Sequence, residues 1–150
     1  MTDSRLSEVL DSPRRRDRLG LSLLALRISV FIVMLVWTLD KFLHPEHAAG
    51  VYERFYFLGG LGPAAVKAIG AAELVLIVAF VSGVAKRWTY GAVLVLHGVS
   101  TVASFRQYLD PFNNLLFFAA WPMLAACLTL YLLREYDTRW AFEGPGRFPL

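Results

Sequence analysis

Four long stretches of the chain are almost entirely apolar, and polar residues gather between them and at both ends. The stretches are residues 19–39, 66–84, 89–105 and 115–133. A helix needs about 20 mostly apolar residues to cross the hydrocarbon core of a bilayer. The pattern therefore predicts an all-α fold, a bundle of four transmembrane helices that forms a single integral membrane domain over residues 1–150.

The segment between the first two stretches has a helical pattern of its own. Pro45 suits the first turn of a helix and the pair Gly59 and Gly60 suits its end. Apolar and aromatic residues recur between them at helical spacing, and these are Ala48, Val51, Tyr52, Phe55 and Tyr56. We predict an amphipathic helix that lies on the outer surface and caps the bundle. A tight re-entrant hairpin is the alternative.

Lys and Arg are divided unevenly between the two sides of such a bundle. If both termini are cytoplasmic, the inner side carries Arg5, Arg14, Arg15, Arg16, Arg18, Lys86, Arg87, Arg134, Arg139 and Arg147, and the outer side carries Lys41, Arg54, Lys67 and Arg106. Positive charge concentrates on the cytoplasmic side of membrane proteins. We therefore predict a multi-pass protein of the cell inner (plasma) membrane with cytoplasmic tails at 1–18 and 134–150.

The composition agrees with a membrane protein and excludes several other classes. Of the 150 residues, 57% are hydrophobic and 18% are charged, whereas soluble domains have about 45–50% apolar and about 25% charged residues. This excludes a disordered, collagen-like or disulfide-rich secreted chain. The net charge of +3 follows from the topological bias and requires no nucleic acid. Cys127 is the single cysteine, which excludes an internal disulfide and a multi-cysteine metal site.

Three residues with charged or imidazole side chains lie well inside the apolar stretches, away from the ends: Arg27, Glu73 and His97. Such residues are costly in a membrane and usually face the bundle interior. Counted from the cytoplasmic ends of their stretches, all three lie at a depth of roughly 12–16 Å, at ~1.5 Å per residue. We predict that they form one polar cluster, in which Arg27 keeps Glu73 ionised and His97 exchanges a proton. Alternatively, Arg27 and Glu73 only tie helices together and His97 makes one satisfied hydrogen bond.

Polar residues also form a stripe along the third stretch. His97, Thr101, Ser104 and Tyr108 are spaced by three or four residues, and Ser100 lies beside them. The stripe predicts a polar groove that opens outward, so that Ser100, Thr101 and Ser104 join the cluster as a candidate quinone pocket. The alternative is that these hydroxyls bond to backbone of their own or a neighbouring helix.

A second polar group is predicted at the outer face. It consists of Asp40, Lys41, Arg106 and Asp110. Asp40 and Lys41 are a candidate interfacial ion pair that Lys67 could share, but solvated charges are the favoured interpretation of these three residues. His44 and His47 are spaced three residues apart, but two imidazoles without a third ligand do not predict a metal site. We predict no metal site and no self-contained catalytic motif.

Parts of the sequence resemble a known family. An arginine early in the first stretch, the run Asp40-Lys41-Phe42 at its end, and the Gly-x-x-Glu of Gly70 and Glu73 resemble the DoxX/DoxD-like four-helix membrane proteins. The resemblance covers roughly residues 19–136. It implies a membrane subunit near quinone or sulfur redox chemistry, since some members are similar to the membrane subunit of thiosulfate:quinone oxidoreductase. The related architecture of vitamin K epoxide reductase is disfavoured, because its paired cysteines are missing here.

Two functional hypotheses follow. In the first, the chain is an accessory subunit of a redox system that holds a quinone near Glu73 and His97. The sequence has no flavin fingerprint, cluster ligands or second thiol, so a soluble or membrane oxidoreductase partner would bring the electrons. In the second, the chain is a non-catalytic scaffold or assembly subunit whose charged tails dock a soluble partner.

Overall fold

The computed structural model describes residues 13–142, and every regular element in this range is helical. The all-α prediction is therefore confirmed for the described chain. The long helices are α2 (Pro13–Leu43), α4 (Pro63–Val81), α5 (Lys86–Ala103) and α7 (Ala120–Leu132). The shorter elements are α3 (Pro45–Tyr56), α6 (Phe105–Tyr108) and the 3₁₀ turns η1 (Pro111–Asn113), η2 (Leu115–Ala119) and η3 (Arg134–Tyr136).

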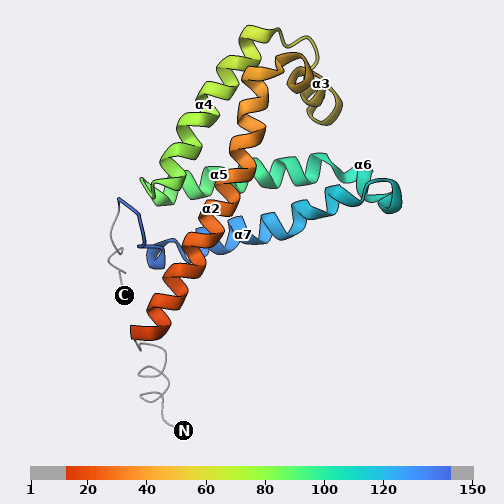
Figure 1. Ribbon diagram of the computed structural model, residues 1–150. Helices are drawn as coiled ribbons and strands as arrows, with labels where there is room; N and C mark the ends of the chain where they lie inside the picture. The colour runs from red at the N-terminus through yellow and green to blue at the C-terminus, as the bar shows by residue number, and fades with distance from the viewer. Residues whose placement is uncertain (1–12, 143–150) are drawn as a thin grey trace.

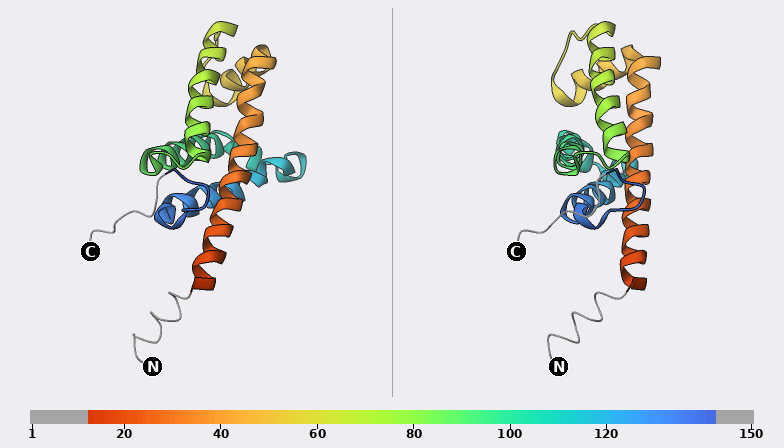
Figure 2. Two further views of the ribbon diagram at one scale, coloured as in Figure 1. Left: turned by 60° about the vertical axis from the view of Figure 1, so that its left-hand side comes forward. Right: turned by 90° about the vertical axis from the view of Figure 1, so that its left-hand side faces the viewer.

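The long helices form two arms that cross steeply. Helices α2 and α4 lie side by side as one arm, and α5 and α7 form the other (Figure 1). In the right-hand view of Figure 2, α5 and α7 are seen almost end on while α2 and α4 run along their length. The arms therefore do not form a bundle of four aligned helices. The turn after α4 redirects the chain, because Gly83 and Ala85 both have left-handed φ values, 63° and 47°.

Several helix boundaries differ from the predicted ones. Helix α2 begins at Pro13, so residues 13–18 extend the first helix instead of belonging to a tail. Residues 1–12 and 143–150 of the predicted tails lie outside the described part. The third predicted stretch is interrupted at Ser104, between α5 and α6. The fourth begins as the 3₁₀ turn η2 and becomes α-helical at Ala120.

Three of the described helical segments are long and apolar enough to cross a membrane. They are Arg14–Leu43, Pro63–Val81 and Leu115–Leu132. Helix α5 is not among them. It begins with Lys86 and Arg87 and carries His97 and two hydroxyl residues in its second half, which lowers its hydropathy. The helix predicted between Pro45 and Gly59 is present as α3.

The apolar core lies where the arms cross. Its buried members are Leu23, Val30, Met34, Ile77, Phe80, Tyr90, Val93, Cys127 and Leu130. The rings of Phe80 and Tyr90, one from each arm, meet edge to face at 4.8 Å. The arms diverge beyond this core, and α3 lies near the free end of the first arm (Figure 1). This geometry leaves space between the arms.

Candidate functional site: a cavity between the two arms

A cavity of about 840 Å³ lies between the arms and is bordered by α3. Its volume is in the upper part of the roughly 300–1,000 Å³ range of small-molecule sites. Aliphatic and aromatic side chains form most of the wall. The aromatic members are Trp37, Tyr52, Phe55, Tyr56 and Phe117. A flat apolar ligand would therefore find both ring contacts and aliphatic packing in this cavity.

Helix α3 borders the cavity because one of its faces packs inward. The Phe55 ring lies 5.9 Å from the ring of Phe117, so α3 in one arm contacts the segment that leads into the other. Ala48 is buried on the same helix. The helix ends at Tyr56, and the left-handed backbone of Phe57 (φ 59°) turns the chain so that the Leu58 N–H donates to the carbonyl of Tyr52 at 3.2 Å.

An ion pair between the first two long helices lies in the cavity wall. Lys41 Nζ is 2.7 Å from Glu73 Oε2, and the two side chains are only 10% and 16% exposed. Lys41 also donates to the carbonyl of Trp37 at 3.1 Å. The sequence-based pairing of Glu73 with Arg27 is therefore wrong.

The register between α2 and α4 explains this error. Gly70 packs against Lys41, since a Cβ added to Gly70 would lie 3.0 Å from the Lys41 Cβ. Gly83 packs against Arg27, since a Cβ added to Gly83 would lie 3.0 Å from the Arg27 Nη1. Glu73 is thus one turn from Lys41 but about ten residues from the level of Arg27, or roughly 15 Å at ~1.5 Å per residue. The predicted depths assumed that residues 19 and 84 lie at the same level, whereas Arg27 itself lies beside Gly83.

Arg27 is fully buried in a different network. Its Nη1 lies 3.2 Å from Asp137 Oδ2 and 3.1 Å from the Tyr90 hydroxyl, which donates to the same carboxylate at 2.8 Å. Nη2 donates to the backbone carbonyls of Arg139 and Trp140. None of these residues lines the cavity. Asp137 was not predicted from the sequence because this residue was assigned to a cytoplasmic tail. The available signal was Arg27 itself, since an arginine within an apolar stretch indicates that a carboxylate elsewhere in the chain pairs with it.

His97 lines the cavity with one ring nitrogen already engaged. Its Nε2 lies 3.0 Å from the carbonyl oxygen of Ala120, at the start of α7, and both residues belong to the cavity wall. Glu73 lies in the same wall on α4. The cavity therefore gathers Glu73 and His97, but no direct bond joins them among the described residues.

The hydroxyl stripe of α5 is divided between the wall and the helix backbone. Thr101 donates to the carbonyl of His97 at 2.8 Å, and Ser104 donates to that of Ser100 at 3.1 Å. The hydroxyls of Thr101 and Ser104 thus bond to the backbone of their own helix, which was the alternative to a polar groove. Ser100 and Ser104 still line the cavity, whereas Thr101 is buried and does not.

The four residues of the predicted outer-face group do not come together. Asp40 accepts from Nδ1 of His44 and of His47, at 3.3 and 2.7 Å, whereas Lys41 pairs with Glu73. On α6, the Arg106 guanidinium lies 5.9 Å from the Phe105 ring, and Asp110 accepts from Asn113. The end of α2 and helix α6 belong to the free ends of different arms (Figure 1). Within residues 13–142, no group of three or more His, Cys, Asp or Glu is arranged to hold a metal ion.

Tyr52 is a site residue that sequence reasoning assigned only to an apolar helix face. Burial raises the pKa of its phenol from 10.0 to about 12, and the charges of Glu73 and Tyr56 add to the rise. Tyr52 lines the cavity, so it presents a protonated hydroxyl at neutral pH. Together with Lys41 it supplies hydrogen-bond donors near the Glu73 carboxylate.

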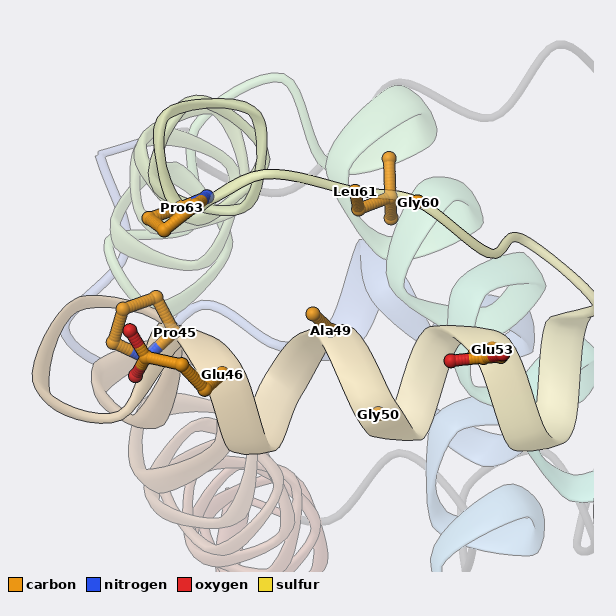
Figure 3. A pocket seen from close by; sticks show the side chains of 8 residues that line it. All are labelled: Pro45, Glu46, Ala49, Gly50, Glu53, Gly60, Leu61 and Pro63. Atoms are coloured by element: carbon orange, nitrogen blue, oxygen red, sulfur yellow. The ribbon is translucent and has the colours of Figure 1, made fainter.

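A second, shallower hollow of about 290 Å³ lies between α3 and the loop that follows it. Figure 3 shows Glu46 and Glu53 on α3 opposite Gly60 and Leu61. Its only charged groups are these two carboxylates, which do not by themselves define a ligand. The larger cavity is therefore the candidate site.

Comparisons of the chain with protein-family models, curated proteins and solved structures find no match.

Proposed function

We propose that this chain is a multi-pass membrane protein that binds a quinone in the cavity between its arms, as an accessory subunit of a membrane redox system. The observation that carries the proposal is the cavity itself. It combines about 840 Å³ of largely apolar, aromatic-lined space with Lys41, Tyr52, Glu73 and His97 in its wall.

The polar groups fit the chemistry of a quinone. Its ring is flat and apolar, and its two carbonyl oxygens accept hydrogen bonds from donors such as the Lys41 ammonium and the Tyr52 hydroxyl. When a quinone is reduced it takes up protons, which positioned histidines and carboxylates transfer efficiently. Glu73 and His97 are the groups in the wall suited to that task.

The proposal places α2, α4, α5 and α7 across the membrane with both tails cytoplasmic, and the steep crossing of the arms (Figure 1) requires the two arms to tilt in opposite directions from the membrane normal. The distribution of Lys and Arg supports this orientation. A chain with both ends on one side crosses an even number of times, so α5 becomes the fourth span beside the three apolar segments. Helix α3 then lies at the outer interface, as the predicted amphipathic cap.

The resemblance to the DoxX/DoxD-like proteins is part of the proposal and gains one supporting observation. The motif residues of the first and second apolar stretches meet at one place. A Cβ on Gly70 would lie 3.0 Å from Lys41 Cβ and 3.1 Å from the Phe42 ring, and Glu73 pairs with Lys41. Two of the three features that carry the resemblance thus form one helix contact beside the cavity, whereas the third, Arg27, lies in the separate network with Asp137.

The test is quinone binding to the purified chain in lipid nanodiscs, followed by quenching of tryptophan fluorescence with a short-tail benzoquinone. Trp37 lies in the cavity wall and would report occupancy. Ala72→Phe fills the cavity, whereas Ala71→Phe places the same ring on an adjacent exposed position outside it. We expect saturable binding, weakened at least tenfold by Ala72→Phe, weakened by Tyr52→Phe because that change removes a hydroxyl donor, and unchanged by Ala71→Phe. Absence of saturable binding, or equal affinity in all variants, would contradict the proposal.

The buried Arg27 network favours a second candidate function, a non-catalytic scaffold or assembly subunit. Four groups contact the two terminal guanidinium nitrogens outside the cavity wall, whereas Nε has no partner among the described residues. These contacts indicate that Arg27 stabilises the fold and does not bind a ligand. Purification in a mild detergent separates the candidates. A co-purifying flavin or thiol protein together with extracted quinone supports the redox subunit, whereas a ligand-free complex with a structural partner supports the scaffold.

A further inference from the structure

The bond between His97 and Ala120 determines which imidazole nitrogen carries the proton. A backbone carbonyl oxygen can only accept a hydrogen bond, so Nε2 of His97 must be the donor in the 3.0 Å contact with Ala120. A neutral imidazole has one N–H group. Nδ1 of the neutral ring is therefore a bare acceptor.

This acceptor is free to meet a ligand. The hydrogen bond to Ala120 is the only one that His97 makes with the described residues. Nδ1 is also absent from the buried polar atoms that lack a partner, so it retains accessible surface. Because His97 lines the cavity, the lone pair of Nδ1 is a recognition element for whatever occupies the space beside it.

We infer that the cavity selects the reduced, hydroxyl-bearing form of its ligand, a hydroquinone that donates one O–H to Nδ1 of His97. This inference rests on the proposed function. A quinone offers only carbonyl acceptors, and an acceptor placed against the Nδ1 lone pair makes no hydrogen bond. A hydroquinone offers two hydroxyl donors, so it satisfies Nδ1 where the oxidised ligand cannot.

The other polar groups in the wall do not cancel this preference. Lys41 and Tyr52 are donors, and they can donate to a quinone carbonyl or to a hydroquinone hydroxyl oxygen, because a hydroxyl both donates and accepts. Glu73 is an acceptor and, like Nδ1, favours a ligand with O–H groups. The acceptors Glu73 and His97 are therefore the groups that distinguish the hydroquinone from the quinone. Glu73 is already paired with Lys41, whereas His97 has no ion-pair partner among the described residues.

The experiment compares a short-tail hydroquinone with its own quinone, both titrated without oxygen against the full chain in nanodiscs. Loss of one hydrogen bond to a buried acceptor corresponds to about a tenfold loss of affinity, so we expect wild type to bind the hydroquinone about tenfold tighter. His97→Gln should keep the preference, because its amide nitrogen can donate to Ala120 while its oxygen accepts. His97→Phe should lose most of this preference, because Glu73 is then the remaining charged acceptor in the wall.

Equal binding of both forms by wild type, or an unchanged preference in His97→Phe, would overturn the inference while leaving quinone binding intact. Binding of neither form would contradict the proposed function as well. Nitrogen-15 NMR of histidine-labelled wild type provides a readout that does not depend on the variants' folding. We expect the Nε2–H tautomer for His97, and the Nδ1–H tautomer would overturn the inference.

Discussion

Arg27 Nη1 lies 3.2 Å from Asp137 Oδ2, and neither side chain is exposed to solvent. The pair joins the middle of the first long helix to the segment that follows α7. Around it, Phe142 N–H donates to the carbonyl of Ser82, so the end of the described chain is held against the turn between the arms. The arms are thus tied together where they cross.

Removing the Asp137 charge should destabilise the protein strongly. In Asp137→Asn the Arg27 guanidinium stays buried without its counter-charge, and breaking one side of a buried pair costs about 3–5 kcal/mol. Unfolding in mild detergent by denaturant would measure this loss. Glu135→Gln is the matched control, because its pair with Arg134 is 25% and 34% exposed and should contribute less than about 1 kcal/mol. Equal losses of stability in the two variants would show that the buried Arg27–Asp137 pair does not hold the two arms together.

Two glycines should respond to alanine with opposite signs. Gly83 has φ +63°, and a Cβ there would lie 2.6 Å from the Ala141 Cβ, so Gly83→Ala should cost about 1–3 kcal/mol. Gly50 lies within α3 with nothing within 4 Å of an added Cβ. Gly50→Ala should therefore stabilise the protein by about 0.5–1 kcal/mol. Thermal unfolding of both variants checks the contrast, and a neutral Gly83→Ala would contradict the close packing of the last described segment.

The Lys41–Glu73 pair should show coupling in a double-mutant cycle. Lys41→Met and Glu73→Gln each leave a largely buried charge without its partner, while the double variant removes both charges. We expect the double variant to lose less stability than the two single losses added together, by about 0.5–3 kcal/mol. Lys67→Met, on an exposed position of α4, should change stability by less than about 0.5 kcal/mol. Strict additivity of the two cavity substitutions would refute the pairing.

Tyr52 should make stability fall in alkaline solution. Its pKa rises from 10.0 to about 12 on folding, so between these values the unfolded chain loses the phenolic proton while the folded chain keeps it. Stability is therefore unaffected by this group below pH 10 and declines from about pH 10 to 12. The ultraviolet titration of tyrosinate in wild type minus Tyr52→Phe measures the pKa. Glu73→Gln should lower it, since the Glu73 charge contributes to the rise, and a pKa near 10 would show that the phenol is not buried.

The sequence was a good guide to features that depend on neighbouring residues. The apolar stretches became α2, α4, α5 and α7 because a run of apolar residues favours helix and burial wherever it packs. Pro45 and the glycines after Tyr56 bracketed α3, since proline and glycine act on the backbone locally. Glu73, His97, Ser100 and Ser104 also reached one cavity wall, because each is a polar exception on a face that turns toward other helices.

The tertiary structure decided which of these residues meet. The partner of a buried charge depends on the register between helices. The predicted depths took residue 19 as level with residue 84, whereas Arg27 itself lies beside Gly83, so Arg27 was placed beside the wrong carboxylate. Asp137 became its partner because the chain after α7 folds back onto the crossing point, a contact between residues far apart in sequence. The cavity likewise exists because the arms diverge beyond their shared core, and no local pattern encodes that angle. The apolar runs predicted the long helices, three of which are long and apolar enough to cross a membrane, whereas packing between distant segments determined which polar residues lie together.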